Sequence, residues 1–191
     1  MRKLIAGMQT SVDGKITGAE GYADWVESWS DNYDLIPHVD ACLLGAKMYV
    51  GYEQYWGAIQ NEPGKPLPMT NRLPTQAELQ WARFAKATPH YVLSGSLKSA
   101  NWPKTTFLRG VEDVAALKAQ SGKDIYLVGG AGTLETLIDA GLVDELRLHV
   151  HPLIVGAGQA LFATAKQRRR LELRSVQELK AGRVSLIYDI A

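Results

Sequence analysis

The sequence predicts an α/β fold in which helices flank a mixed, mainly parallel sheet in three layers, with a C-terminal antiparallel hairpin. Short apolar runs alternate with segments of helical periodicity, a pattern typical of parallel sheets with both faces covered. Two further runs, residues 171–178 and 183–190, are joined by a connection that contains Lys180-Ala181-Gly182, and they predict the hairpin. The length of 191 residues fits one domain spanning residues 1–191.

The predicted strands are apolar runs too short to be helices. They cover residues 4–8, 41–44, 91–93, 106–108, 125–128 and 146–151. Gly45 and Gly129 end two of these runs. Residues 11–22 contain three glycines and predict a loop that can move, and residues 60–74 contain four prolines and predict an irregular loop.

Five segments carry helix signals. They are residues 31–38, 46–57, 75–86, 111–120 and 133–140. Ser30 or Asp31 would cap the first, which Pro37 would end, and Gly141 would stop the last. Thr75 and Glu78 have the spacing of a capping box.

Composition excludes several classes of protein. Apolar residues make up 46%, charged residues 21%, and the net charge is +1, so no strong field favours nucleic acid or an anionic membrane. The short basic run 166–170 has no interleaved aromatic residues and is interpreted as a solvated turn. The N-terminal region shows neither a signal peptide nor a membrane span. With Cys42 as the single cysteine, these features favour the cytoplasm.

A glycine-rich turn at residues 129–133 is the most informative segment. The strand at 125–128 leads through Gly129 and Gly130 directly into a helix. The free N–H groups and positive dipole at a helix N-terminus bind phosphate, and glycine lets the backbone approach the anion. Glu135 stands where the Rossmann fingerprint needs its third glycine, so the turn is of another type. A tight turn with no ligand is an equally good interpretation.

Two further turns have the same strand-to-turn arrangement. Gly45 leads into a helix with Lys47 in its first turn, and the run 91–93 leads into Ser94-Gly95-Ser96. Each alone is compatible with a structural glycine beside solvated polar residues. Ligands of open α/β sheets bind at the carboxyl ends of the strands, so the three turns together indicate one shared ligand.

The chain resembles a known family in six segments that occur in this order. They read SVDGKI at 11–16, DACLLG at 40–45, YVLS at 91–94, IYLVGG at 125–130, LVDEL at 142–146 and PLIVGAGQALF at 152–162. Together they resemble the reductase domain of the riboflavin-biosynthesis deaminase-reductase, part of the dihydrofolate-reductase-like superfamily. The chain has no deaminase domain or zinc motif, as in stand-alone members.

This resemblance implies a dihydrofolate-reductase-like fold and an NADPH site built from the three turns. Residues near the first strand would cover the nicotinamide, and the turns would hold the phosphates and adenosine. The implied residues are Ala6, Ile16, Gly18, Gly45, Ala46, Lys47, Met48, Leu93, Ser94, Gly95, Val128, Gly129, Gly130, Ala131, Gly132 and Thr133. The chain departs from the family at Ala46 and Gly95, where arginines that contact phosphate usually stand. NADH therefore remains an alternative to NADPH.

The substrate side has one main candidate, Asp31, at the start of the predicted helix 31–38. Members of the superfamily often place a carboxylate there to bind a heterocycle, although a helix cap explains Asp31 equally well. Asp24 and Asp34 lie nearby, and Asp13 and Lys15 flank a glycine of the loop. The aromatic side chains of residues 49–56 could form a wall for a planar substrate, but packing in the core is their commoner use.

Other candidate sites are weaker. His149 and His151 share one face of a strand, but no third ligand is evident, so we expect no metal. Glu145 is interpreted as structural, and Cys42 as an inert core residue.

Three functions follow. The leading one is a reductase that transfers a hydride from NADPH, or NADH, to a small pterin- or pyrimidine-like heterocycle. The alternative is a non-catalytic nucleotide-binding protein of the same fold. A structural dimer module is the third, because the apolar segment 146–154 could pair across a two-fold axis, and we expect a homodimer.

Overall fold

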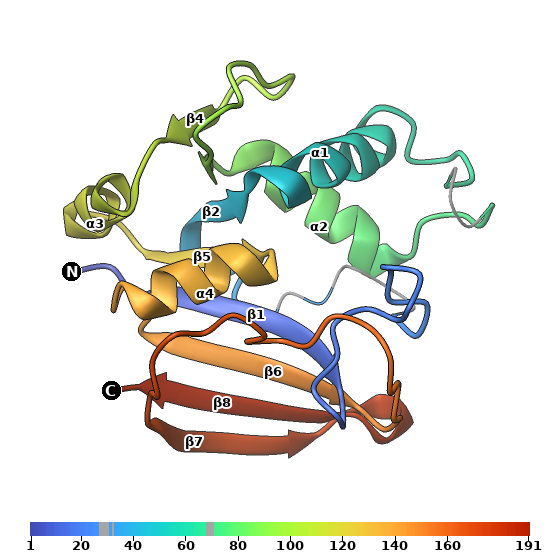
Figure 1. Cartoon of the computed structure of the whole chain (residues 1–191). Coiled ribbons are helices and arrows are strands. Elements are labelled where there is room, and N and C mark those ends of the chain that lie inside the picture. The colour runs from blue at the N-terminus through green and yellow to red at the C-terminus, as the bar shows by residue number, and fades with distance from the viewer. Residues whose placement is uncertain (27–30, 32, 68–70) are drawn as a thin grey trace.

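The computed structural model of the chain describes residues 1–26, 31, 33–67 and 71–191 (Figure 1). Eight strands form one sheet in the order β4-β3-β2-β5-β1-β6-β8-β7. Neighbours from β4 to β6 run parallel, whereas β8 is antiparallel to both β6 and β7. The strands are β1 (Leu4–Ser11), β2 (Val39–Gly45), β3 (His90–Leu93), β4 (Thr105–Leu108), β5 (Asp124–Gly129), β6 (Glu145–His151), β7 (Leu171–Glu178) and β8 (Val184–Ile190). The predicted α/β class and the closing hairpin are confirmed.

The described residues form four helices. They are α1 (Ala46–Asn61), α2 (Gln76–Ala87), α3 (Val111–Ala119) and α4 (Ala131–Asp139), and a 3₁₀ turn (Lys180–Gly182) joins β7 to β8. Of the four, α1, α3 and α4 each follow a strand within a few residues. The capping box is confirmed, since Thr75 Oγ1 accepts from Glu78 N and the Glu78 carboxylate accepts from Thr75 N. Helix α1 extends to Asn61, so the loop after it begins later than predicted.

Two cores cover the two faces of the sheet. The face under α1 and α2 is aromatic and contains Tyr49, Tyr52, Trp56 and Trp81. The face under α3 and α4 is aliphatic, with side chains such as Val114 among its members. The aromatic residues 49–56 thus chiefly build the core, and their interpretation as a substrate wall is not needed.

The predicted helix 31–38 is wrong for its described residues. Ser30, one proposed cap, lies outside the described residues. Tyr33 and Asp34 have φ angles of 53° and 58°, in the left-handed region that a right-handed helix excludes. The Tyr33 ring packs against Tyr126 and His149, with ring centroids 6.1 and 4.2 Å apart. This tertiary packing overrides the local helix signal.

Strand β6 lies inside the sheet, between β1 and β8. The prediction that segment 146–154 pairs across a two-fold axis is therefore wrong for the strand it contains, because both edges of β6 are already paired. The strand at that end of the sheet is β7, where the side chains of Leu173 and Val176 are 57% and 61% exposed.

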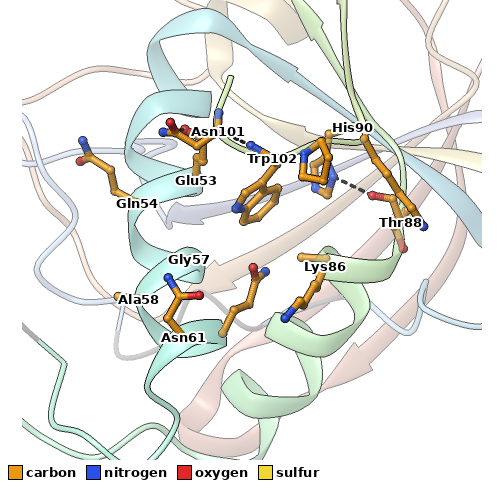
Figure 2. Close-up of a pocket in the computed structure, with 14 residues that line it drawn as sticks. Glu53, Gln54, Gly57, Ala58, Asn61, Lys86, Thr88, His90, Asn101 and Trp102 are labelled. Atoms are coloured by element: carbon orange, nitrogen blue, oxygen red, sulfur yellow. Dashed lines mark hydrogen bonds between the residues drawn. The ribbon is translucent and has the colours of Figure 1, made fainter. Parts of the chain in front are cut away.

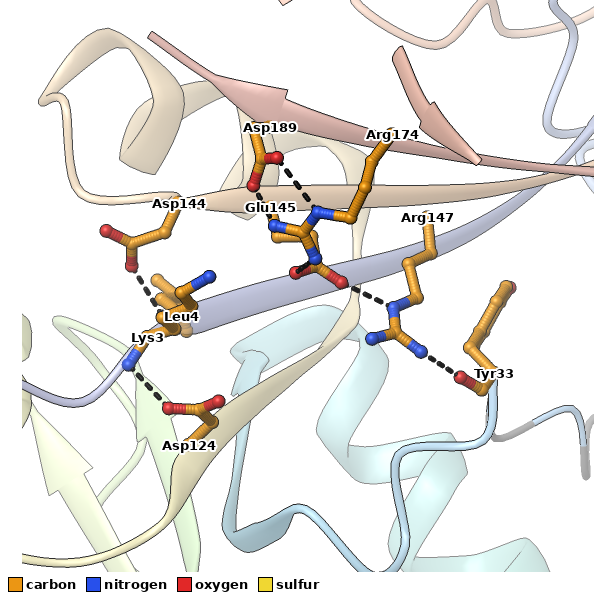
Figure 3. A network of polar contacts seen from close by, with 9 residues as sticks. All are labelled: Lys3, Leu4, Tyr33, Asp124, Asp144, Glu145, Arg147, Arg174 and Asp189. Carbon is orange, nitrogen blue, oxygen red and sulfur yellow. Dashed lines mark hydrogen bonds and ion pairs between the residues drawn. The ribbon is translucent and has the colours of Figure 1, made fainter. Parts of the chain in front are cut away.

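A polar network fastens the N-terminus and the C-terminal strands to the centre of the sheet (Figure 3). The carboxylate of Glu145 accepts from Arg147 Nε and Arg174 Nη1, both at 2.6 Å. Arg147 also donates to the main-chain carbonyl of Tyr33, and Asp124 accepts from Lys3 N at 2.8 Å. Glu145 is thus a structural anchor, as predicted. None of the helices in the described ranges has the length and hydropathy needed to cross a membrane.

Candidate functional site

The three turns singled out in the sequence lie side by side at one edge of the sheet. In the register of β2 with its neighbours, Gly45 pairs with Leu93 of β3, and Leu44 pairs with Gly129 of β5. The carboxyl ends of β3, β2 and β5 therefore meet. The structure brings together all the site residues expected at 45–48, 93–95 and 128–133 in these turns.

The turn at Gly45 and the turn at residues 129–133 are in direct contact. A Cβ atom on Gly45 would collide with the hydroxyl of Thr133 in its present position, so the lack of a side chain at Gly45 permits this close approach. Across the same junction, a Cβ atom on Gly129 would lie 2.7 Å from Met48 Sδ, and Gly129 has a φ of 143°. The peptide bond that joins Gly129 to Gly130 is cis. The starts of α1 and α4 are thus held against each other.

Both of these helices begin without the groups that usually stabilise a helix N-terminus. Their N-cap residues are Gly45 and Gly130, no side chain caps either helix, and neither has an acidic residue in its first turn. By contrast, α2 begins with a capping box, and α3 has Glu112 and Asp113 in its first turn. The positive dipole ends left uncompensated are those of the two helices that start at the candidate site.

Thr133 has a different place from the one expected. Helix α4 begins at Ala131, two residues before the predicted start, so Thr133 lies inside its first turn. Its hydroxyl lies against Gly45. Thr133 is thus part of the contact between the two turns.

The third turn is held by an arginine that sequence reasoning missed. Ser94 Oγ accepts from Leu97 N at 2.9 Å. Arg109, from the end of β4, donates through Nη1 to the carbonyls of Ser94 and Leu97 at 2.7 and 2.8 Å. A Cβ atom on Gly95 would have no neighbour within 4 Å. The guanidinium of Arg109 therefore lies at this turn, although residue 95 is a glycine. The pairing of β4 with β3 brings Arg109 there, and the local sequence does not show this.

The loop after β1 is fastened to residues 153–161. Ile16 N donates to Gln159 O at 2.9 Å, and the carboxylate of Asp13 accepts from the main-chain N–H groups of Val155 and Gly156. Hydrogen bonds from the Ser11 hydroxyl and these N–H groups lower the pKa of Asp13 to about 2. Asp13 is thus engaged in holding the loop. Ala6, also expected at the nicotinamide, is fully buried in the aliphatic core.

Trp25 is a second residue that sequence reasoning missed. Its indole N–H is buried and has no hydrogen-bond partner among the described residues. The ring lies 3.9 Å from the position of a Cβ on Gly18, one of the residues expected at the nicotinamide. A buried donor without an acceptor is costly, so Trp25 points to a bound molecule or water beside this loop.

Asp31 lies in a cluster that the tertiary structure assembles. Its Oδ2 accepts from Arg183 Nη1 at 2.8 Å and lies 3.2 Å from His149 Nδ1. Burial favours the neutral acid, but His149 and Arg183 outweigh it and lower the pKa of Asp31. These residues, with Tyr33 and Lys180, line a cavity of about 250 Å³. The alternation of polar residues along β6 was the sequence signal for this surface.

The two histidines of β6 have protein partners. His149 contacts Asp31, and His151 Nε2 lies 2.8 Å from Gln9 Oε1. In the parts of the chain that the structure describes, no group of three potential metal ligands occurs. Cys42 is buried, and burial raises the pKa of its thiol.

Comparison with known proteins agrees with this architecture. The RibD C-terminal domain family matches residues 2–185. The protein YyaP of Bacillus subtilis (strain 168) is 31% identical over 191 residues, covering 98% of this chain and 94% of YyaP.

Solved structures show the same fold. A putative riboflavin biosynthesis protein from Shewanella sp. PV-4 superposes with a TM-score of 0.71 at 18% identity, covering 99% of both chains. Dihydrofolate reductase from Enterococcus faecalis, complexed with NADP(H), superposes with a TM-score of 0.63 at 17% identity, covering 98% of this chain and 96% of that one. The fold is thus dihydrofolate-reductase-like, and the chain belongs to the RibD C-terminal domain family.

Proposed function

We propose that the protein is a reductase that transfers a hydride from a reduced nicotinamide dinucleotide to a small heterocycle. The observation that carries this proposal is the contact between two uncapped helix N-termini, at Gly45 and Thr133. Two positive dipole ends at one glycine-lined junction fit a diphosphate, which needs N–H donors and close backbone approach.

The residues present fit a dinucleotide along this edge. The main-chain N–H groups at the start of α1 and α4 would bind the diphosphate, and the turn at Ser94 would border the adenosine. The loop at Ile16 and Gly18, with the buried indole N–H of Trp25, would enclose the nicotinamide and exclude water. The bound nicotinamide supplies the hydride, and the protein chiefly orients its reacting carbon.

We propose that Asp31 binds the substrate. Its Oδ2 is taken by His149 and Arg183, whereas Oδ1 accepts no hydrogen bond from the described residues. The lowered pKa keeps the carboxylate ionised, so Oδ1 can accept from a ring N–H of a pterin- or pyrimidine-like heterocycle. The Enterococcus faecalis neighbour is a dihydrofolate reductase, which supports a substrate of this class.

Arg109 favours NADPH over NADH. Among the described residues, the Arg109 guanidinium is hydrogen-bonded through Nη1 alone, so Nε and Nη2 remain as donors for the 2′-phosphate that distinguishes NADPH. A guanidinium binds phosphate through paired hydrogen bonds. Arg109 would thus supply from β4 what Gly95 does not supply from β3.

Titration with each cofactor, followed by tryptophan fluorescence, tests the proposal. We expect saturable quenching in the micromolar range with NADPH and weaker binding of NADH. Both dinucleotides should lose some affinity in Arg109→Met, because Arg109 also holds the turn at Ser94. NADPH should lose about tenfold more than NADH, because a charge-assisted hydrogen bond to the 2′-phosphate contributes roughly 1.5–3 kcal/mol. The exposed Arg83 of α2 provides the control Arg83→Met.

The outcomes separate the candidate functions. No response to either dinucleotide would remove the reductase proposal. Binding of NADPH without its oxidation across a panel of pterins and pyrimidines would favour the non-catalytic nucleotide-binding alternative.

Two further expectations belong to the proposal. A homodimer would use the exposed strand β7, where Leu173 and Val176 form an apolar strip, and light scattering of the Leu173→Lys variant tests it. A cytoplasmic location suits the single buried thiol of Cys42, and fractionation of cells tests it.

A further inference from the structure

The larger of the two cavities described lies away from the glycine-rich edge. It has a volume of about 650 Å³, within the range of small-molecule sites. The C-terminal half of α1, the end of α2, the start of β3 and residues 101–104 enclose it (Figure 2). Its β3 residue is His90, at the opposite end of the strand from Leu93 and the candidate cofactor turns.

A buried carboxylate fixes one wall of this cavity. Glu53 accepts from the main-chain N–H groups of Asn101 and Trp102 at 2.7 and 3.0 Å and from Asn101 Nδ2 at 2.7 Å. The Tyr49 hydroxyl donates to the same carboxylate at 2.7 Å. A buried carboxylate is tolerated only when hydrogen bonds compensate its lost hydration, and here four donors do so. Glu53 therefore holds residues 101–102 in place.

Trp102 forms the aromatic floor. Its ring contacts His90 and Tyr52 edge to face, with centroids 4.8 and 5.6 Å apart. The indole N–H faces Gly57 of α1, where a Cβ atom would lie 3.7 Å from Nε1. The missing side chain leaves this N–H open to the cavity, and it donates no hydrogen bond to another of the described residues.

Two charged groups at the cavity, Glu53 and Lys104, already have protein partners. Lys104 donates to the carbonyl of Ala87 at 2.8 Å, and Lys86 stands in the last turn of α2, so both ammonium groups offset the negative end of that helix. The Glu53 carboxylate is fully bonded. Burial lowers the pKa of His90 to about 4, so this ring is neutral. Glu53 and His90 therefore offer a ligand no unmatched charge.

We infer that this cavity is a second binding site, for an uncharged planar heteroaromatic molecule of the nucleobase class. Its ring lies beside the edge of Trp102 and offers an acceptor to the indole N–H. The ends of α1 and α2 leave carbonyl groups without intrahelical donors, and these accept the N–H groups of the ligand. This site is independent of the proposed reductase function.

Calorimetric titration with adenine, neutral at pH 7, tests the inference on the whole chain. Gly57→Leu places a branched side chain in the cavity and should weaken adenine binding at least tenfold. Gly51→Leu is the matched control, because Gly51 lies on the same helix, is exposed and has nothing within 4 Å of a Cβ. Trp102→Phe keeps a ring but removes the N–H, and should weaken binding roughly fivefold to tenfold.

The result expected is adenine binding that Gly57→Leu weakens at least tenfold and Gly51→Leu preserves, with NADPH binding equal in both variants. The inference is overturned if adenine does not bind at millimolar concentration, or if Gly57→Leu binds it as the wild type does. If Gly57→Leu does not fold, unchanged binding by Trp102→Phe overturns it equally. If the wild type does not bind NADPH, that result contradicts the reductase proposal and leaves the adenine-site inference untouched.

Discussion

Adding a carboxylate to the first turn of α1 should stabilise the free protein and weaken its binding of a dinucleotide. Ala46 is the first residue of α1, a helix with no side-chain cap and no acidic residue in its first turn. An aspartate there meets the positive end of the helix dipole, which contributes about 0.3–1 kcal/mol. For a chain of this size, the melting temperature should rise by roughly 1–4 °C.

The same carboxylate would repel a bound diphosphate. Two like charges about 6 Å apart interact by roughly 0.7 kcal/mol in water and about 3 kcal/mol near a protein surface. We therefore expect NADPH to bind Ala46→Asp about tenfold more weakly or worse. High salt should reduce the difference, because the junction is open to solvent ions.

Ala77→Asp is the control. Ala77 lies in the exposed first turn of α2, away from the three turns. Because Glu78 already meets the helix dipole there, the Ala77→Asp variant should gain little stability and should keep its affinity for NADPH. Melting curves and NADPH titrations of both variants, at low and high salt, measure the two effects. Wild-type affinity in Ala46→Asp would refute the placement of phosphate at α1.

Three further predictions concern stability. Gly129→Ala should destabilise the fold by about 2 kcal/mol or more in urea unfolding, because its φ of 143° and the nearby Met48 Sδ leave no room for a Cβ. Burial opposes ionisation of Glu78, but bonds from Arg72 and the capping box outweigh it and hold its pKa at about 2. The free energy of unfolding should therefore fall by up to about 3 kcal/mol as the pH falls from 4.5 to 2. The Glu78→Gln variant should lack this dependence on pH. Burial lowers the pKa of His90 from 6.5 to about 4. As the pH falls, the unfolded chain therefore protonates this ring at a higher pH than the folded protein does. Unfolding free energy should therefore fall by up to about 3 kcal/mol between pH 6.5 and 4, and a His90→Gln variant whose slope matches the wild type would contradict this assignment.

Local periodicity was enough to predict most of the secondary structure. The strands and the helices after residue 45 appear within a few residues of their predicted limits, because each apolar run has a face to bury and a glycine or cap at its end. Residues 31–38 are the exception. Tyr33 takes its left-handed conformation to pack against Tyr126 and His149, and neither contact is visible in the local sequence.

The sequence by itself determined the α/β class and the glycine-rich turns, since both depend on residues close together in the chain. Only the tertiary structure decided which side chains meet. It places Arg109 at the turn of Ser94 and joins Asp31 to His149 and Arg183, across 118 and 152 positions of the chain. Such contacts depend on strand order and register, which long-range packing selects and local periodicity does not specify.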